Sequence, residues 1–108
     1  MASINKATII GFVGQEPKVD TLQTGTKVTQ FSVATTEKGY TTQGGTTVPD
    51  RTEWHNIVLW GKLAEIAGQY LHKGSSVYIE GKIRTRSYDD RNGIKRYVTE
   101  IHGDIMQM

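Results

Sequence analysis

The ionisable side chains are spaced in a way that argues against catalysis. The histidines His55, His72 and His102 lie in different predicted elements, with no carboxylate at metal-ligand spacing from them. The sequence has no H-E-x-x-H, no Walker A motif and no nucleophile elbow. Asp89 and Asp90 are adjacent, so their carboxylates would point to opposite faces of a strand. We therefore expect no enzyme activity, no metal site and no cofactor.

A second group of residues combines aromatic rings with cations, which suits binding to unpaired nucleic acid. Trp54 and Trp60 are six positions apart, so a strand would place both indoles on one face, about 20 Å from each other. Stacking on a ring is worth ~1–3 kcal/mol per base and tolerates any sequence, because every base has a π-face. Alternatively, both indoles are core or subunit contacts, since tryptophan is usually highly buried. The whole group comprises Trp54, Trp60, Lys62, Arg84, Arg86, Tyr88, Lys38, Tyr40 and Arg51.

The composition bounds the class of protein without identifying a partner. A chain of 108 residues has the size of one domain. Its 13 basic and 11 acidic residues give a net charge of +2, too little to indicate a nucleic-acid partner by itself. The absence of cysteine fits a reducing compartment, and the sequence has neither a long apolar run nor the apolar core of a signal peptide. We expect a soluble protein.

Extended segments dominate the first half of the chain. Ile4–Val13 is predicted to be a long coiled strand, and Val19–Leu22 and Lys27–Thr36 the next extended pair, joined by a turn at 23–26. Glu37–Arg51 is almost free of apolar residues, so we predict a long loop without structure of its own. This loop is either an arm that closes on a ligand or an untied hairpin tip.

One helix and two further strands follow the tryptophan strand. In that strand, His55, Ile57 and Leu59 share the face opposite the indoles and are predicted to face the core or a subunit contact. An amphipathic helix is predicted next and should end at Gly74. Its apolar stripe consists of Leu63, Ile66, Ala67, Tyr70 and Leu71, and we assign all of them, Tyr70 included, to packing. Ser75–Arg86 then alternates as a strand.

The dipeptide Asn92-Gly93 predicts a two-residue type I′ hairpin turn. That turn would place Asp90 opposite Lys95 and Tyr88 opposite Tyr97, and it would also pair Asp89 with Arg96. The order of elements becomes three strands, one helix and two strands. This order is typical of an OB-fold, a five-stranded Greek-key barrel with a helix between strands 3 and 4, whose face and loops bind oligonucleotides or oligosaccharides.

Several motifs in combination resemble the bacterial single-stranded DNA-binding protein family along essentially the whole chain. The most specific are Thr52-Glu53-Trp54-His55, Gly61-Lys62-Leu63-Ala64-Glu65 and Tyr78-Ile79-Glu80-Gly81. The resemblance implies one OB-fold domain over residues 1–108, in a homotetramer that binds and protects single-stranded DNA in replication, recombination and repair. It also implies a cytoplasmic, nucleoid-associated location, and neither catalysis nor a cofactor.

The resemblance further implies roles for individual residues. Trp54, Trp60, Tyr88 and Tyr40 would stack on bases, while Lys6, Lys62, Lys73, Arg84 and Arg86 would contact phosphates. His55 and Tyr78 would lie at subunit contacts. Tyr40, Trp60 and Tyr88 differ from the rings most common at those positions in the family but keep a π-face, and Phe12 stands where the family more often has a polar residue.

Family members usually continue into a flexible tail with an acidic tip that recruits replication and repair proteins. The chain ends at Met108 without such a tail, so we expect no recruitment of that kind. Two other functions remain open from the sequence. One is an OB-fold protein-interaction module of the primosome, which would form dimers, and the other is an RNA-binding OB domain.

Overall fold

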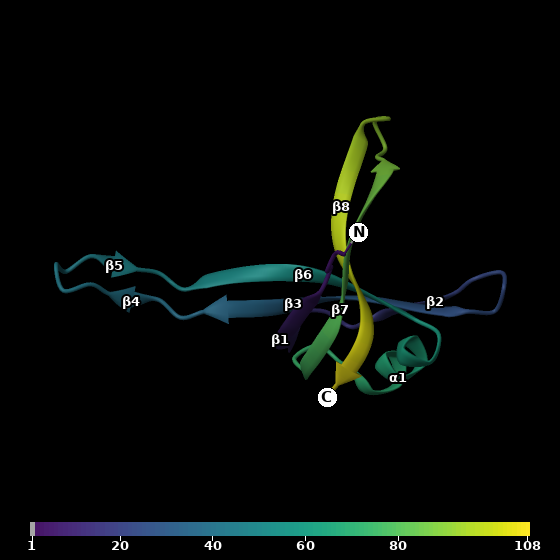
Figure 1. Ribbon diagram of the computed structural model, residues 1–108, viewed down its shortest axis with the longest axis horizontal. Helices are drawn as coiled ribbons and strands as arrows, with labels where there is room; N and C mark the ends of the chain where they lie inside the picture. Colours follow the sequence, from purple (N-terminus) through teal and green to yellow (C-terminus); the bar gives the residue numbers. More distant parts are fainter. Residues whose placement is uncertain (1) are drawn as a thin grey trace.

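Five long strands form a closed ring in the computed structural model, which describes residues 2–108. They are β1 (Ala7–Val13), β3 (Lys27–Glu37), β6 (Arg51–Trp60), β7 (Ser76–Asp89) and β8 (Lys95–Gln107), hydrogen-bonded in the order β1-β7-β8-β6-β3. A short β1–β3 pairing closes the ring, and within residues 2–108 only the β6–β8 pair is parallel. The helix α1 (Lys62–Tyr70) connects β6 to β7, so the predicted OB-fold is confirmed (Figure 1).

Alternation along the strands separates the core from the surface. Ile57 and Leu59 of β6 are buried, as predicted for the face opposite the indoles. At Gly11 a Cβ atom would collide with the Ala34 carbonyl. Glycine therefore lets β1, which pairs with β7, also lie close to β3. The core cluster consists of Ile9, Val13, Phe31, Val33, Ile57, Leu59, Ala64, Ala67, Leu71, Val77, Ile79 and Ile101.

The helix packs against the barrel through small residues. Ala64 and Ala67 are buried, as is Leu71 directly after the helix, and the Thr29 hydroxyl donates a 2.7 Å hydrogen bond to the Ala64 carbonyl. The assignment of Tyr70 to packing was wrong, because its side chain is 61% exposed. Because the small alanines let the helix approach β3 closely, the buried side of the helix is centred on Ala64 and Ala67. Tyr70 lies to one side of this buried stripe. No helix in residues 2–108 is long and apolar enough to span a membrane.

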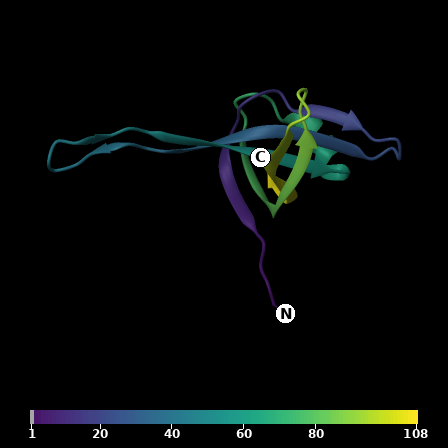
Figure 2. The same cartoon turned by 90° about the horizontal axis from the view of Figure 1, so that it is seen from above.

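The segment 37–51, predicted to lack structure, instead extends the β3–β6 hairpin. It contains the short strands β4 (Tyr40–Thr41) and β5 (Thr47–Val48), which pair antiparallel. The Asp50 carboxylate accepts a 2.6 Å hydrogen bond from the Gly39 amide at the base of this pair. Figures 1 and 2 show that this β4–β5 arm projects far from the barrel, while the β7–β8 hairpin projects in a different direction.

The three hairpin turns share one hydrogen-bond pattern. In the turn from β2 (Lys18–Thr21) to β3, the Leu22 amide bonds to the Thr26 carbonyl and the Gly25 amide to the Leu22 carbonyl. Residues 42–46 and 90–94 repeat this pattern, and the fourth residue of each turn is a glycine with positive φ. This is a three-residue loop with glycine in the left-handed conformation.

The predicted type I′ turn at Asn92-Gly93 was therefore wrong, and the register that it implied was wrong by one residue. Asp89 pairs with Lys95, Tyr88 with Arg96 and Ser87 with Tyr97. The cause is Asp90, whose Oδ1 accepts hydrogen bonds from the amides of Asn92 and Ile94. Its Oδ2 accepts another from Arg96 Nε at 2.9 Å. These bonds favour a turn that begins at Asp90.

Candidate nucleic-acid interface

Both indoles lie on the outer face of β6 and are open to solvent. Trp54 is 60% and Trp60 45% exposed, which excludes the alternative that they are core residues of the single chain. Val58, between them on the same face, is buried. Trp54 lies against Gly14 at the end of β1, where a Cβ atom would collide with the ring. Glycine at that position thus leaves room for a flat indole on the sheet.

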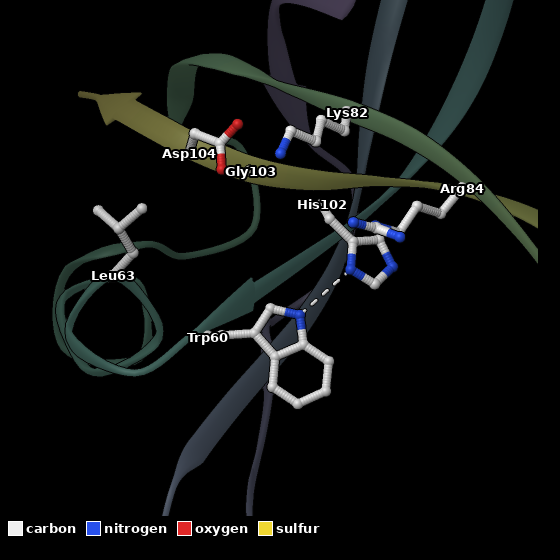
Figure 3. Close-up of a pocket in the computed structure, with 7 residues that line it drawn as sticks. All are labelled: Trp60, Leu63, Lys82, Arg84, His102, Gly103 and Asp104. Atoms are coloured by element: carbon white, nitrogen blue, oxygen red, sulfur yellow. Dashed lines mark hydrogen bonds between the residues drawn. The ribbon is translucent and has the colours of Figure 1, made fainter. Parts of the chain in front are cut away.

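Trp60 lies at the edge of a hollow of about 590 Å³ between β6, β7 and β8. Its indole Nε1 donates a 3.2 Å hydrogen bond to His102 Nδ1 (Figure 3). The other residues that line the hollow are Leu63, Lys82, Arg84, Gly103 and Asp104. Of the predicted site residues, the structure thus brings Trp60 and Arg84 together in one hollow.

Arg86 and Tyr88 form a second ring-and-cation pair on β7. The Arg86 guanidinium carbon lies 5.9 Å from the centroid of the Tyr88 ring, within the range of a cation–π interaction. The same guanidinium donates from Nε to the Glu100 carboxylate at 3.1 Å, and that carboxylate is buried, with its side chain only 7% exposed. Tyr88 itself is 47% exposed, so its ring is accessible to a base.

Tyr40, Lys62 and Lys73 are exposed on different elements of the fold. Tyr40, on β4, is 63% exposed in the β4–β5 arm. It shares a hollow of about 450 Å³ with Lys38 and Arg51. Lys62 is the first residue of α1, and Lys73 follows the helix, where its backbone amide donates to Glu16. The candidate rings and cations therefore extend over the barrel and its arms rather than converging on one cavity.

Lys6 is engaged in a cluster on the outer side of β7. Its ammonium lies 2.7 Å from Glu80 Oε1, and the Tyr78 hydroxyl donates a 2.6 Å hydrogen bond to Glu80 Oε2. The bonds from Lys6 and then Tyr78 hold the pKa of Glu80 below its ordinary value, and the bond to Glu80 raises the pKa of Lys6. The negative charge of Glu80 is thereby neutralised within the chain.

The two predicted subunit contacts lie on different parts of the barrel. His55 is half-buried on β6 and its Nε2 lies 2.8 Å from the Thr35 hydroxyl. Tyr78 is half-buried on β7 and pairs across the sheet with Ile10 of β1. Ile10 and Phe12 are 69% and 60% exposed, so Tyr78 borders an apolar strip on the surface of β1.

The sequence-based selection missed His102 and Lys82 as residues of the Trp60 hollow. They pair directly across β7 and β8. The type I′ register would have paired Lys82 with Gly103 instead, which turns His102 toward the other face of the sheet. The turn chemistry of Asp90 was the signal that could have placed them together.

Comparisons of the sequence and of the fold identify related proteins. Residues 4–108 match the Single-strand binding protein family. A Bacteroides thetaiotaomicron protein named single-stranded DNA-binding protein is 56% identical over 106 residues, covering 98% of this chain and 66% of its own length. The solved structure titled "Plasmodium falciparum SSB complex with ssDNA" superposes with a TM-score of 0.83 at 32% identity, covering 99% of this chain and 94% of that one. The chain belongs to the single-strand binding protein family.

Proposed function

We propose that the protein binds single-stranded DNA without sequence preference and protects it during replication, recombination and repair. The observation that carries this proposal is the set of large exposed rings with neighbouring cations on the outer surface of the barrel and its arms. The rings are Trp54, Trp60, Tyr88 and Tyr40, and the phosphate contacts are Lys6, Lys62, Lys73, Arg84 and Arg86. The names of the Bacteroides relative and the Plasmodium complex support the choice of ligand.

The chemistry of the surface favours unpaired strands over duplex. An exposed indole or phenol ring offers a flat apolar face, and only an unpaired base can place its own face against that ring. Arg86 beside Tyr88 and Arg84 beside Trp60 put a positive charge near each ring, where the phosphate of a stacked nucleotide would lie. Such contacts carry no base-specific hydrogen bonds, so binding should tolerate any sequence.

Self-association into a homotetramer is part of the proposal. His55 and Tyr78 are the proposed subunit contacts, and the exposed strip of Ile10 and Phe12 beside Tyr78 supports an interface there. Residues 7–11 of β1 pair with β7 on one side and have no strand partner on the other among the described residues. A free strand edge beside exposed apolar side chains is a surface that a second copy can cover.

Titration of a fluorescently labelled oligo-dT at several salt concentrations tests the function. Binding should weaken with salt at a log–log slope of about −0.7 per phosphate neutralised, and mixed-sequence strands should compete as well as oligo-dT. Oligo-U in the same competition separates a DNA-binding from an RNA-binding domain, which would bind both equally. Absence of salt-sensitive oligo-dT binding would contradict the proposal.

A further inference from the structure

His102 lies beside Trp60 in the same hollow, at a position that the proposed contacts do not include. We propose that the two rings form one stacking site, so that His102 contacts the nucleic-acid base together with Trp60. This inference rests on the proposed function and adds a residue to it. We refer to the pair as the Trp60–His102 platform.

The two rings lie edge to edge rather than one above the other. An indole N–H points outward in the plane of its ring, so the 3.2 Å bond from Trp60 Nε1 to His102 Nδ1 joins the ring edges. The centroids are 6.1 Å apart and the planes differ by 29°. Figure 3 shows both rings face-on, side by side, with the hydrogen bond between them. The pair therefore extends the flat surface of the indole by a second ring.

A carboxylate lies near the other side of the imidazole. Because Nδ1 accepts the bond from Trp60, the neutral imidazole carries its proton on Nε2. Nε2 lies 3.5 Å from Glu100 Oε1, and the buried Glu100 carboxylate is in turn held by Arg86. The bond from Trp60 on β6 to His102 on β8 thus orders the Trp60–His102 platform before any ligand arrives, which reduces the ordering cost of binding.

The charges around the platform suit a nucleotide. Lys82 pairs across the strands with His102, and Lys82 and Arg84 line the same hollow. Asp104 is the acidic residue among the lining side chains. The His102 side chain is 23% exposed, so part of the ring remains accessible in the hollow. A nucleotide whose base stacks on the two rings would have its phosphate near the positive charges of Lys82 and Arg84.

Substitutions at position 102 can separate a ring that stacks from a group that only anchors Trp60. His102→Phe keeps a flat ring but cannot accept the indole hydrogen bond. His102→Gln keeps an acceptor but has no ring, and His102→Ala has neither. We expect His102→Phe to bind oligo-dT within about twofold of wild type, and His102→Gln and His102→Ala to bind about fivefold more weakly, the low end of a stacking contact.

The reverse order, with His102→Gln close to wild type and His102→Phe weakened, would show that His102 only anchors Trp60 and would overturn the inference. Equal affinities for all variants, or equal losses, would also overturn it. Thermal melts followed by circular dichroism confirm that each variant folds, and His102→Tyr serves as the ring variant if His102→Phe does not. If the wild type binds oligo-dT and the substitutions at position 102 do not change the affinity, the platform alone is refuted. If the wild type does not bind oligo-dT, the proposed function is refuted as well.

Discussion

At the scale of single residues, β6 turns one face to the core and carries both exposed indoles on the other. Ile57 and Leu59 are at most 1% exposed and belong to the core, while Trp54 and Trp60 protrude from the other side. A side chain that lies largely on the surface contributes less to the free energy of folding than a core residue, because its removal opens no internal cavity. Removal of such a side chain should instead lower the affinity for nucleic acid.

We therefore predict that Trp54→Ala and Trp60→Ala each weaken binding of oligo-dT by ~1–3 kcal/mol, the range for loss of a stacked ring. The thermal transition should stay nearly unchanged. Fluorescence anisotropy with labelled oligo-dT gives the affinity, and circular dichroism gives the transition. Tyr70→Ala is the matched control, since this ring is exposed on α1 outside the proposed contacts.

Leu59→Ala provides the opposite control on the same strand. Truncation of this fully buried leucine should destabilise the fold by ~2–5 kcal/mol. If the tryptophan variants lost stability in this way while keeping their affinity, the indoles would be structural and the stacking role would be wrong.

The cluster of Lys6, Tyr78 and Glu80 predicts a dependence of stability on acid. The pKa of Glu80 is held below its ordinary value of 4.5, so its ionised form stabilises the folded state above that pH. This contribution is lost as the pH falls through the lowered pKa of the folded state. Glu80→Gln should therefore reduce the loss of unfolding free energy below pH 4.5, measured by urea unfolding at a series of pH values.

Glu65→Gln, on the exposed surface of α1, should leave the acid dependence of the wild type intact. An identical acid dependence in Glu80→Gln and wild type would show that the bonds to Lys6 and Tyr78 contribute nothing to folding.

At the scale of elements, the hairpin turns set the register of the strands and so determine which side chains lie opposite each other. The sequence indicated the turns at 23–26 and at Asn92-Gly93, because glycine and polar residues interrupt the apolar alternation there, whereas it predicted 37–51 as a loop without structure of its own. It did not reveal the register of β7 against β8 through Asn92-Gly93 alone, since the Asp90 carboxylate competes for the turn amides and starts the turn one residue earlier. A shift of one residue exchanges the faces of a strand. The register predicted from the sequence therefore did not place His102 opposite Lys82.

The shared turn predicts a specific role for Gly93. Its φ of +75° lies in the left-handed region, and a Cβ atom added there would meet nothing within 4 Å, so strain alone opposes substitution. Gly93→Ala should cost about 1–2 kcal/mol of stability, and Gly93→Asn less, because asparagine tolerates this conformation. Urea unfolding measures both.

Gly44→Ala, in the matching turn of the β4–β5 arm, has no positive φ and meets only the Thr42 hydroxyl at 3.9 Å. It should not lower stability. Equal stability of Gly93→Ala and Gly44→Ala would exclude the turn assigned to residues 90–94.

At the scale of the whole molecule, the order of strands and helix was sufficient to predict the OB-fold. Ile57 and Leu59 face the core as the alternation of the tryptophan strand predicted, and the helix follows directly after that strand, as the barrel requires. Two features depended on contacts that a sequence pattern does not contain. The close approach of Ala64 to β3 displaced Tyr70 from the core, and the Gly39–Asp50 bond ordered the base of the β4–β5 arm.

The apolar strip on β1 predicts that the protein associates with itself. Sedimentation velocity should show a tetramer, and Ile10→Lys should shift it toward smaller species, because a charge in the middle of a buried interface is costly. Gln69→Lys, exposed on α1 outside the proposed interface, is the control and should leave the assembly unchanged. A monomeric wild type would contradict the proposed assembly, and a dimer would favour a protein-interaction module instead.

The central claim is that exposed rings on the barrel and its arms capture the faces of unpaired bases. Competition between labelled oligo-dT and unlabelled duplex of equal length tests it most directly, because both ligands carry phosphates but only the single strand exposes its bases. We predict that duplex displaces oligo-dT only at concentrations at least about thirtyfold above those of unlabelled oligo-dT, since two stacked rings supply ~2–6 kcal/mol. Equal displacement by duplex and single strand would show that phosphate contacts alone explain binding and would contradict the claim.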